Sequence, residues 1–95
     1  TYDPTYSYEL AVIIQHGLER MYAKNEDVYF YITLMNENYI HPAMPQGAEN
    51  GIIKGMYLLK KADKPLKHQV QLFGSGTILR EVIAASELLQ EYDVS

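Results

Sequence analysis

Residues 28–35 read Val-Tyr-Phe-Tyr-Ile-Thr-Leu-Met, an unbroken apolar run that is rich in β-branched and aromatic side chains. A run without alternating polar positions predicts a strand that is covered on both of its faces. Such strands belong to parallel sheets packed between helices, so the run predicts an α/β fold. In these folds ligands bind beyond the carboxyl ends of the strands, which makes the following residues the first place to search for a site.

Those following residues, 36–47, read Asn-Glu-Asn-Tyr-Ile-His-Pro-Ala-Met-Pro-Gln-Gly. Two prolines predict a loop, because proline breaks a helix and biases the residue before it away from helical geometry. The loop carries Glu37 and His41, a carboxylate and an imidazole that can bind a substrate and move protons near neutral pH. A surface glutamate and a histidine that caps a loop would give the same pattern, so spacing alone leaves both interpretations open.

A helix is predicted before the strand. Asp3-Pro4 and Ser7 are both suitable starts, and apolar residues spaced by three and four continue the helix to about Tyr22. Gly17 lies inside this helix, where glycine costs up to about 1 kcal/mol relative to alanine. Its presence therefore predicts close packing of the helix against a neighbouring residue.

The second half of the chain contains further predicted elements. A short helix is expected over residues 48–54 and a short strand over residues 56–59. Residues 60–67 hold a proline and four lysines, which predicts an exposed linker. Residues 70–73 predict another strand, and an apolar stripe predicts an amphipathic helix over residues 78–90. Strand, turn and helix open a new α/β unit, and we expect its parallel partner strand to be missing.

The turn of that unit, Gly74-Ser75-Gly76-Thr77, allows two interpretations. Backbone N–H groups at a strand-to-helix turn can hold a phosphate, but the spacing matches neither the dinucleotide fingerprint nor the Walker loop. A tight turn with a hydroxyl helix cap explains the same residues. The remaining histidines, His16 and His68, are expected to be structural or solvated, since the three histidines have no metal-binding spacing.

Composition excludes several classes of function. Eight Lys and Arg against twelve Asp and Glu give a formal charge of −4, which disfavours nucleic acid or an anionic membrane as a partner. No run approaches the roughly 20 apolar residues of a membrane span, and the N-terminus lacks the regions of a signal peptide. The absence of cysteine removes disulfides and thiolate zinc sites and favours a cytosolic origin. The absent initiator methionine suggests a piece of a longer protein.

Several segments together resemble one known family. The segments are Tyr2-Asp3-Pro4, residues 8–13, residues 16–22, residues 28–33, Asn36-Glu37-Asn38-Tyr39 with residues 42–49, and residues 70–80. They resemble the homodimeric, bacterial type of the pyruvate dehydrogenase first component, a thiamine-diphosphate-dependent decarboxylase. The resemblance covers essentially the whole chain but only a small part of that family's much longer polypeptide.

The resemblance implies a transketolase-like architecture of three α/β domains. Residues 1–62 then correspond to the C-terminal part of the middle, pyrimidine-binding domain. Residues 63–69 correspond to a linker, and residues 70–95 to the opening strand and helix of the C-terminal domain. Because the absence of cysteine favours a cytosolic origin and the resemblance is to a bacterial type, we expect a bacterial cytoplasmic protein.

For function, the resemblance implies decarboxylation of pyruvate on thiamine diphosphate with Mg²⁺, followed by transfer of the two-carbon unit to a lipoyl group. The lipoyl group belongs to the partner acetyltransferase of a multienzyme complex. His41 matches a histidine that positions substrate and assists proton movements, and Glu37 matches a glutamate of the same site. Tyr2 matches a tyrosine near the substrate.

Two family motifs lie outside the chain, namely the Gly-Asp-Gly metal and diphosphate motif and the glutamate that activates the aminopyrimidine ring. We therefore expect the chain alone to be inactive and to bind neither cofactor nor metal. A different class of function is a standalone α/β interaction module that buries its tyrosine-rich first helix against a partner. The flanking coding sequence distinguishes the two, because only the first interpretation requires the reading frame to continue.

Overall fold

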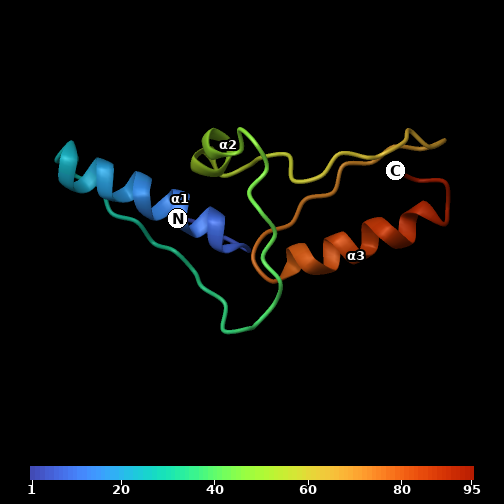
Figure 1. Cartoon of the computed structure of the whole chain (residues 1–95), viewed down its shortest axis with the longest axis horizontal. Coiled ribbons are helices and arrows are strands. Elements are labelled where there is room, and N and C mark those ends of the chain that lie inside the picture. Colours follow the sequence, from blue (N-terminus) through green and yellow to red (C-terminus); the bar gives the residue numbers. More distant parts are fainter. The chain divides into compact units, whose positions relative to one another are not determined.

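The computed structural model describes all 95 residues, Thr1–Ser95. The chain divides into two compact units, Thr1–Leu59 and Lys60–Ser95. The first unit holds the helices α1, η1 and α2, and the second holds α3 (Figure 1). Their bounds are Ser7–Leu18 for α1, Glu19–Ala23 for the π-helix η1, Glu49–Lys54 for α2 and Ile78–Gln90 for α3.

The predicted first helix is confirmed as α1 continued by η1. The chain is extended at Tyr6, with φ −109° and ψ 152°, and turns into helix at Ser7. The helix ends just beyond the predicted Tyr22, and Asn25 follows with φ 50°. Positive φ is incompatible with continuing a right-handed helix, so the chain changes direction there.

The small core of the first unit lies between α1 and α2. Ile13 of α1 and Ile52 of α2 are 3% and 4% exposed, and Ala48 completes the buried cluster. Burying an isoleucine side chain stabilises a fold by about 1.5–3 kcal/mol. The partly buried side chains around this cluster are Tyr2, Tyr8, Val12, Phe30, Ile32, Met44 and Tyr57.

Gly17 has the close neighbour that its sequence position predicts. The segment after η1 returns along α1 in Figure 1, and it brings the Phe30 ring against the helix. A Cβ atom added to Gly17 would lie 3.3 Å from two carbons of that ring. Glycine is therefore explained by packing of the returning segment on α1.

The predicted strand over residues 28–35 is not formed as a ladder. Only Ile32 pairs, in a parallel bridge with Tyr2. In this bridge the Tyr2 N–H donates to the Tyr31 carbonyl at 2.9 Å, and the Thr33 N–H donates to the Tyr2 carbonyl at 3.0 Å. Residues 56–59 and 70–73 are not strands either. A strand requires a hydrogen-bonded neighbour along its length, and the chain offers these segments only isolated pairs.

The predicted helix over residues 48–54 is confirmed as α2, and it ends in a Schellman motif. Gly55 has φ +88°, the Gly55 N–H donates to the Ile52 carbonyl at 3.0 Å, and the Met56 N–H donates to the Gly51 carbonyl at 2.9 Å. This turn folds the chain back over the helix, so that a Cβ on Gly51 would lie only 2.5 Å from the Tyr57 Cβ. The turn thereby directs Tyr57 toward α1.

The second unit contains the predicted helix α3 and a parallel bridge between His68 and Val94. The His68 N–H donates to the Asp93 carbonyl at 3.1 Å, and the Ser95 N–H donates to the His68 carbonyl at 2.9 Å. This pairing is a single isolated bridge, and neither of the two segments forms a strand. Each unit therefore has helix between two segments that are joined by one parallel bridge, and the predicted α/β sheet is not formed.

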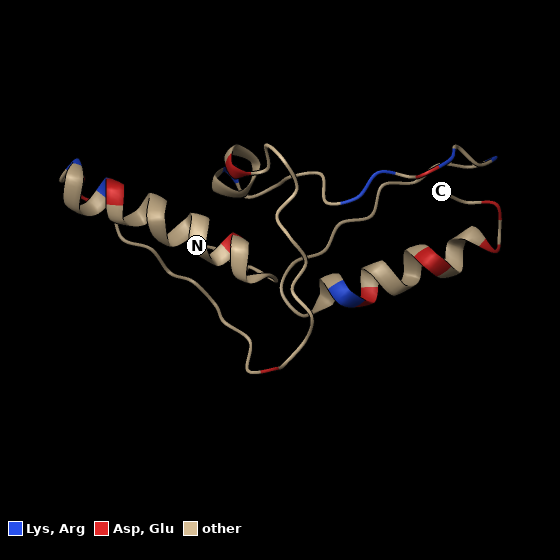
Figure 2. Cartoon of the chain, in the orientation of Figure 1, with Lys and Arg blue, Asp and Glu red and all other residues tan.

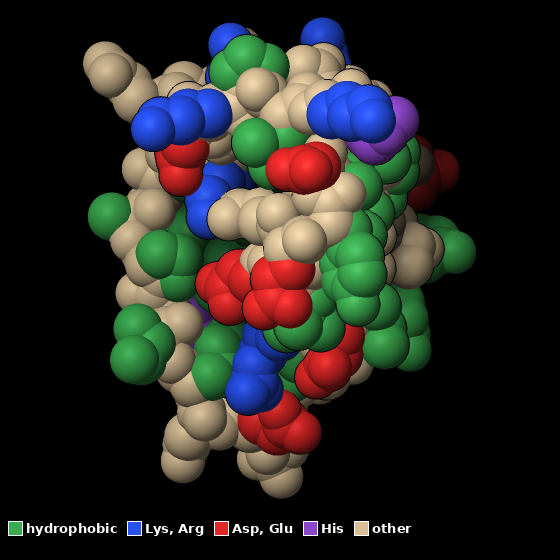
Figure 3. Space-filling view, turned by 90° about the vertical axis from the view of Figure 1, so that its right-hand side faces the viewer, with side chains coloured by type: hydrophobic (Ala, Val, Ile, Leu, Met, Phe, Trp, Pro, Cys, Tyr) green, Lys and Arg blue, Asp and Glu red, His purple; other side chains and the backbone are tan.

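Much apolar surface is uncovered. No residue of α3 is buried. Hydrophobic side chains lie between charged ones on the face drawn in Figure 3.

The charged residues are distributed differently along the second unit. Lysines lie along the predicted linker in Figure 2, and charges of both signs lie along α3. None of the helices is long and apolar enough to cross a membrane.

Candidate functional site

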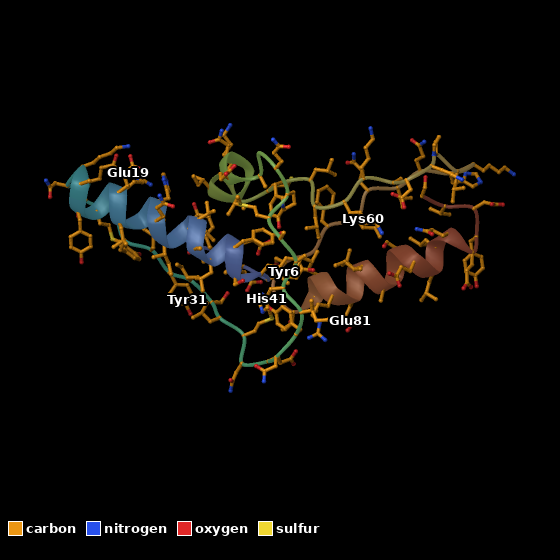
Figure 4. All side chains as sticks on the ribbon, in the orientation of Figure 1. Tyr6, Glu19, Tyr31, His41, Lys60 and Glu81 are labelled. Carbon is orange, nitrogen blue, oxygen red and sulfur yellow. The ribbon has the colours of Figure 1, made fainter.

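His41 lies in the predicted loop, which is irregular and exposed in the structure. Its Nδ1 atom accepts a hydrogen bond of 3.0 Å from the backbone N–H of Ser7, the first residue of α1. That N–H has no partner inside the helix, because the first N–H groups of any α-helix lack one. The loop imidazole therefore completes the N-terminus of α1, and Figure 4 shows His41 beside Tyr6 at this point.

The rings of two tyrosines pack against the His41 ring. The Tyr39 ring stacks on His41 with a centroid distance of 4.5 Å and an interplanar angle of 22°. The Tyr6 ring meets His41 edge-on at 6.1 Å. The Tyr39 hydroxyl donates to the backbone carbonyl of Thr5. Tyr39 and His41 are thereby anchored to the residues that precede α1.

Beneath this cluster lies a buried carboxylate that sequence analysis did not select. Glu9 is 7% exposed, and its Oε2 accepts the backbone N–H groups of Thr5 at 2.6 Å and Tyr6 at 3.1 Å. A glutamate at the third helical position that reaches back to the cap residue is half of a capping box. The spacing Tyr6-x-x-Glu9 is the signal for it, but tyrosine is not a usual cap residue.

Tyrosine hydroxyls complete the hydrogen bonding of Glu9. Tyr57 donates its proton to Glu9 Oε1, and the Tyr8 and Tyr57 hydroxyl oxygens lie 2.6 Å apart. Because Tyr57 has one proton, Tyr8 is the donor in this second bond. Burial and then the bond to Glu9 raise the pKa of Tyr57 well above its usual range. Burial also raises the pKa of Tyr8, although the bond from Tyr8 to Tyr57 opposes that rise.

Glu37 and Tyr2 lie in different surroundings. Glu37 is exposed in the same loop as His41. Tyr2 donates its hydroxyl proton to the Ile53 carbonyl at 2.6 Å, and its ring stacks with Phe30 at a centroid distance of 6.0 Å. Tyr2 and His41 therefore contact different residues.

The turn interpretation of residues 74–77 is confirmed. Ser75 accepts the Ile78 N–H through its carbonyl at 3.1 Å, and a Cβ on Gly74 would lie 3.0 Å from both Leu79 Cα and a methyl of Val82. Gly74 is therefore explained by close packing on α3. Thr77 caps the helix by position but forms no side-chain cap bond, so the hydroxyl cap is not confirmed.

The residues of this chain do not fit a metal ion. No group of three or more His, Cys, Asp or Glu side chains is close enough together to hold one. His16 packs edge-on against Phe30, and His68 pairs through its backbone.

Comparison with known proteins identifies similar chains. Residues 1–42 match the family model described as pyruvate dehydrogenase E1 component middle domain. The chain is 63% identical over 90 residues, 95% of its length, to the pyruvate dehydrogenase E1 component of Pseudomonas aeruginosa. The resemblance to the pyruvate dehydrogenase E1 component is confirmed.

Two further E1 components agree with this match. The chain is 60% identical over 92 residues to the E1 component of Cupriavidus necator and 57% identical over 96 residues to that of Escherichia coli. These matches cover 96% and 99% of the chain. The chain spans only about a tenth of the length of these E1 components.

Proposed function

We propose that this chain is a segment of a pyruvate dehydrogenase E1 component that contributes its 36–47 loop to the catalytic site. The observation that carries the proposal is the 63% identity over 95% of the chain to a protein of that name. The parent enzyme decarboxylates pyruvate and transfers the two-carbon unit to the lipoyl group of its partner acetyltransferase. The architecture of three transketolase-like α/β domains is part of the same proposal.

His41 is the residue best placed for chemistry in this loop. Its Nδ1 is occupied by the Ser7 N–H, so the neutral ring carries its proton on Nε2, on the opposite side of the imidazole. The residue is exposed, and an exposed Nε2–H can donate to a bound substrate or move a proton. We assign His41 as the general acid–base or orienting donor for acetyl transfer.

Glu37 and Tyr2 have secondary roles in this proposal. Glu37 supplies a second hydrogen-bonding group in the exposed loop. The Tyr2 hydroxyl already donates its proton to the Ile53 carbonyl, so it can only accept a hydrogen bond from a substrate. Its contribution is therefore limited to orientation.

The rest of the parent enzyme supplies the cofactor site. Thiamine diphosphate and Mg²⁺, which provide the chemistry of decarboxylation, bind outside this segment, and the isolated chain is inactive. Residues 1–62 form the end of the middle domain, residues 63–69 a linker and residues 70–95 the start of the C-terminal domain. The parent is a cytoplasmic bacterial homodimer.

The test is His41→Ala in the full-length enzyme, with His68→Ala as the matched control. His68 is an exposed histidine of the other unit that pairs only through its backbone. We expect His41→Ala to keep cofactor binding and to slow acetyl transfer to lipoyl domains by about 10²–10⁴-fold. Glu37→Ala should cost less, because a neighbouring acceptor does not transfer the proton itself. Normal complex activity in His41→Ala would contradict the proposal.

A further inference from the structure

We propose that Glu9 and Tyr39 are positioning residues that hold the N-terminus of α1 and the 39–41 segment together. In this arrangement the Ser7 N–H fixes His41 as the Nε2–H tautomer. The tautomer itself follows from contacts within this chain. Only its importance for acetyl transfer rests on the proposed function.

One hydrogen bond, from the Ser7 N–H to His41, selects the tautomer. A nitrogen that accepts a hydrogen bond from a backbone N–H carries no proton, and Ser7 donates to Nδ1 at 3.0 Å. A proton on Nδ1 would place two donors, the Ser7 N–H and the Nδ1–H, opposite each other, and the hydrogen bond would be lost. His41 therefore presents one defined donor, Nε2–H, on the side of the ring away from α1.

The second step is the support of that N–H. Ser7 directly follows Thr5 and Tyr6, whose N–H groups both bind the buried carboxylate of Glu9. Glu9 is held in turn by the Tyr57 hydroxyl, which comes from beyond α2. Losing Glu9 would release the first turn of α1 and, with it, the orientation of the Ser7 N–H.

The third step is the support of the ring. Tyr39 stacks on His41 at 4.5 Å and donates its hydroxyl proton to the Thr5 carbonyl. Thr5 thus binds Glu9 through its N–H and Tyr39 through its carbonyl. One residue therefore connects the carboxylate below the helix start to the aromatic ring that covers His41.

The chain offers a substitution that removes only the selecting bond. Ser7 is the first helical residue, where proline is favoured because its missing N–H has no intrahelical partner. Tyr6 already has the extended geometry that a following proline requires, with φ −109° and ψ 152°. Ser7→Pro therefore deletes the bond to His41 and keeps the helix, whereas Ser7→Ala keeps both.

The experiment is ¹⁵N NMR of the labelled chain, which reports the tautomer through the ring couplings and the bond through a coupling between Ser7 N and His41 Nδ1. We expect the coupling and an unprotonated Nδ1 in the unchanged chain, in Ser7→Ala and in Glu9→Gln, whose amide oxygen can replace the acceptor. In Glu9→Ala and Ser7→Pro we expect the coupling to be lost and the His41 ring to exchange freely between its two tautomers. Glu81→Ala, at an exposed first-turn glutamate of α3, should change nothing.

Circular dichroism checks that each variant keeps its helices. A protonated Nδ1 in the unchanged chain, or the coupling preserved in Glu9→Ala, would overturn the positioning role. Tyr39→Phe gives an independent check, because it keeps the stacked ring and removes the hydroxyl that donates to Thr5. It should weaken the coupling partially, and an unchanged coupling would remove Tyr39 from the proposal.

Enzyme activity tests the proposed function separately from the NMR coupling, which tests the positioning role. In the full-length enzyme, Ser7→Pro should slow acetyl transfer at least 10-fold without changing cofactor binding. Full activity of Ser7→Pro would contradict the catalytic assignment of His41, whereas the positioning role is decided by the coupling measured in Glu9→Ala. A missing coupling in the unchanged chain would contradict the positioning role whatever the activity.

Discussion

The Tyr57 hydroxyl donates a hydrogen bond to the Glu9 carboxylate, although the two residues are 48 positions apart in the sequence. This bond connects the segment after α2 to the first turn of α1. Glu9 also accepts two backbone N–H groups there, so a single buried carboxylate connects the helix start to the returning chain. Thr5, one of these two residues, accepts the Tyr39 hydroxyl through its carbonyl and so connects the 39–41 segment to the same place. Breaking up this arrangement should affect both stability and the His41 loop.

Removing the Tyr57 hydroxyl should destabilise the first unit. Tyr57→Phe leaves Glu9, a buried carboxylate, without one of its donors, which costs about 1–3 kcal/mol. Denaturant unfolding measures this loss. Tyr29→Phe is the matched control, because Tyr29 is 89% exposed and should stay within about 0.5 kcal/mol of the unchanged chain. Equal stability of the two variants would contradict a stabilising Glu9–Tyr57 bond.

The same bond predicts loss of stability at alkaline pH. Burial and the bond to Glu9 raise the pKa of Tyr57 in the folded chain above its ordinary value of 10.0. A raised pKa in the folded state stabilises the fold below the unfolded pKa, and this stability is lost as pH rises above about 10. Unfolding free energy measured from pH 8 to pH 11 should fall at the upper end. Tyr57→Phe should show a smaller fall, and an equal fall would assign the effect to other groups.

Two helical glycines should respond differently to alanine. Alanine favours a helix by up to about 1 kcal/mol over glycine, so propensity alone predicts stabilisation at both. At Gly51 the new Cβ would meet Tyr57 Cβ at 2.5 Å and the Met56 carbonyl at 2.9 Å, whereas at Gly17 it would meet the Phe30 ring at 3.3 Å. We expect Gly51→Ala to cost about 1–3 kcal/mol and Gly17→Ala clearly less. Thermal unfolding of the pair tests this order.

The local part of the fold could be predicted from the sequence because local patterns specify it. The spacing around Ile13 predicts α1, and the prolines at 42 and 45 predict the loop that carries His41. The prediction of a strand over residues 28–35 is wrong for a physical reason. Its composition suits a sheet interior, but strand formation depends on partners elsewhere in sequence, and only Tyr2 pairs with it here.

The contacts around His41 could not be predicted from the sequence, because they join residues far apart along the chain. His41 was selected because imidazole is a chemically distinctive group in a loop. Glu9 was not, because a glutamate in the first turn of a helix is ordinary until Tyr57 returns to bury it. The Ser7–His41 bond joins residues 34 positions apart, and no local pattern specifies it.

The segment between the two units should be the first to be cleaved. Residues 60–67 are exposed apart from half-buried Leu66 and carry four lysines, and the unit boundary falls at Leu59–Lys60. Limited digestion with a lysine-specific protease should therefore cut there before it cuts at Lys24 or Lys54, which lie at helix ends. Mass spectrometry of early fragments identifies the order. First cleavage within residues 8–35 would contradict the division into two units.

The uncovered apolar face of α1 should make the chain self-associate. A depression of about 100 Å³ on this face is lined by apolar side chains of α1 together with Phe30 and Ile32. Beside it, Ile14 and Leu18 are 45% and 51% exposed. Exposed apolar surface of this kind is covered by association in solution. Light scattering against concentration should show dimers or larger species, and Leu18→Lys should reduce them. Leu88→Lys, at a 61% exposed leucine of α3, is the control for added charge. A monomer at high concentration, or equal effects of the two lysine variants, would contradict association through α1.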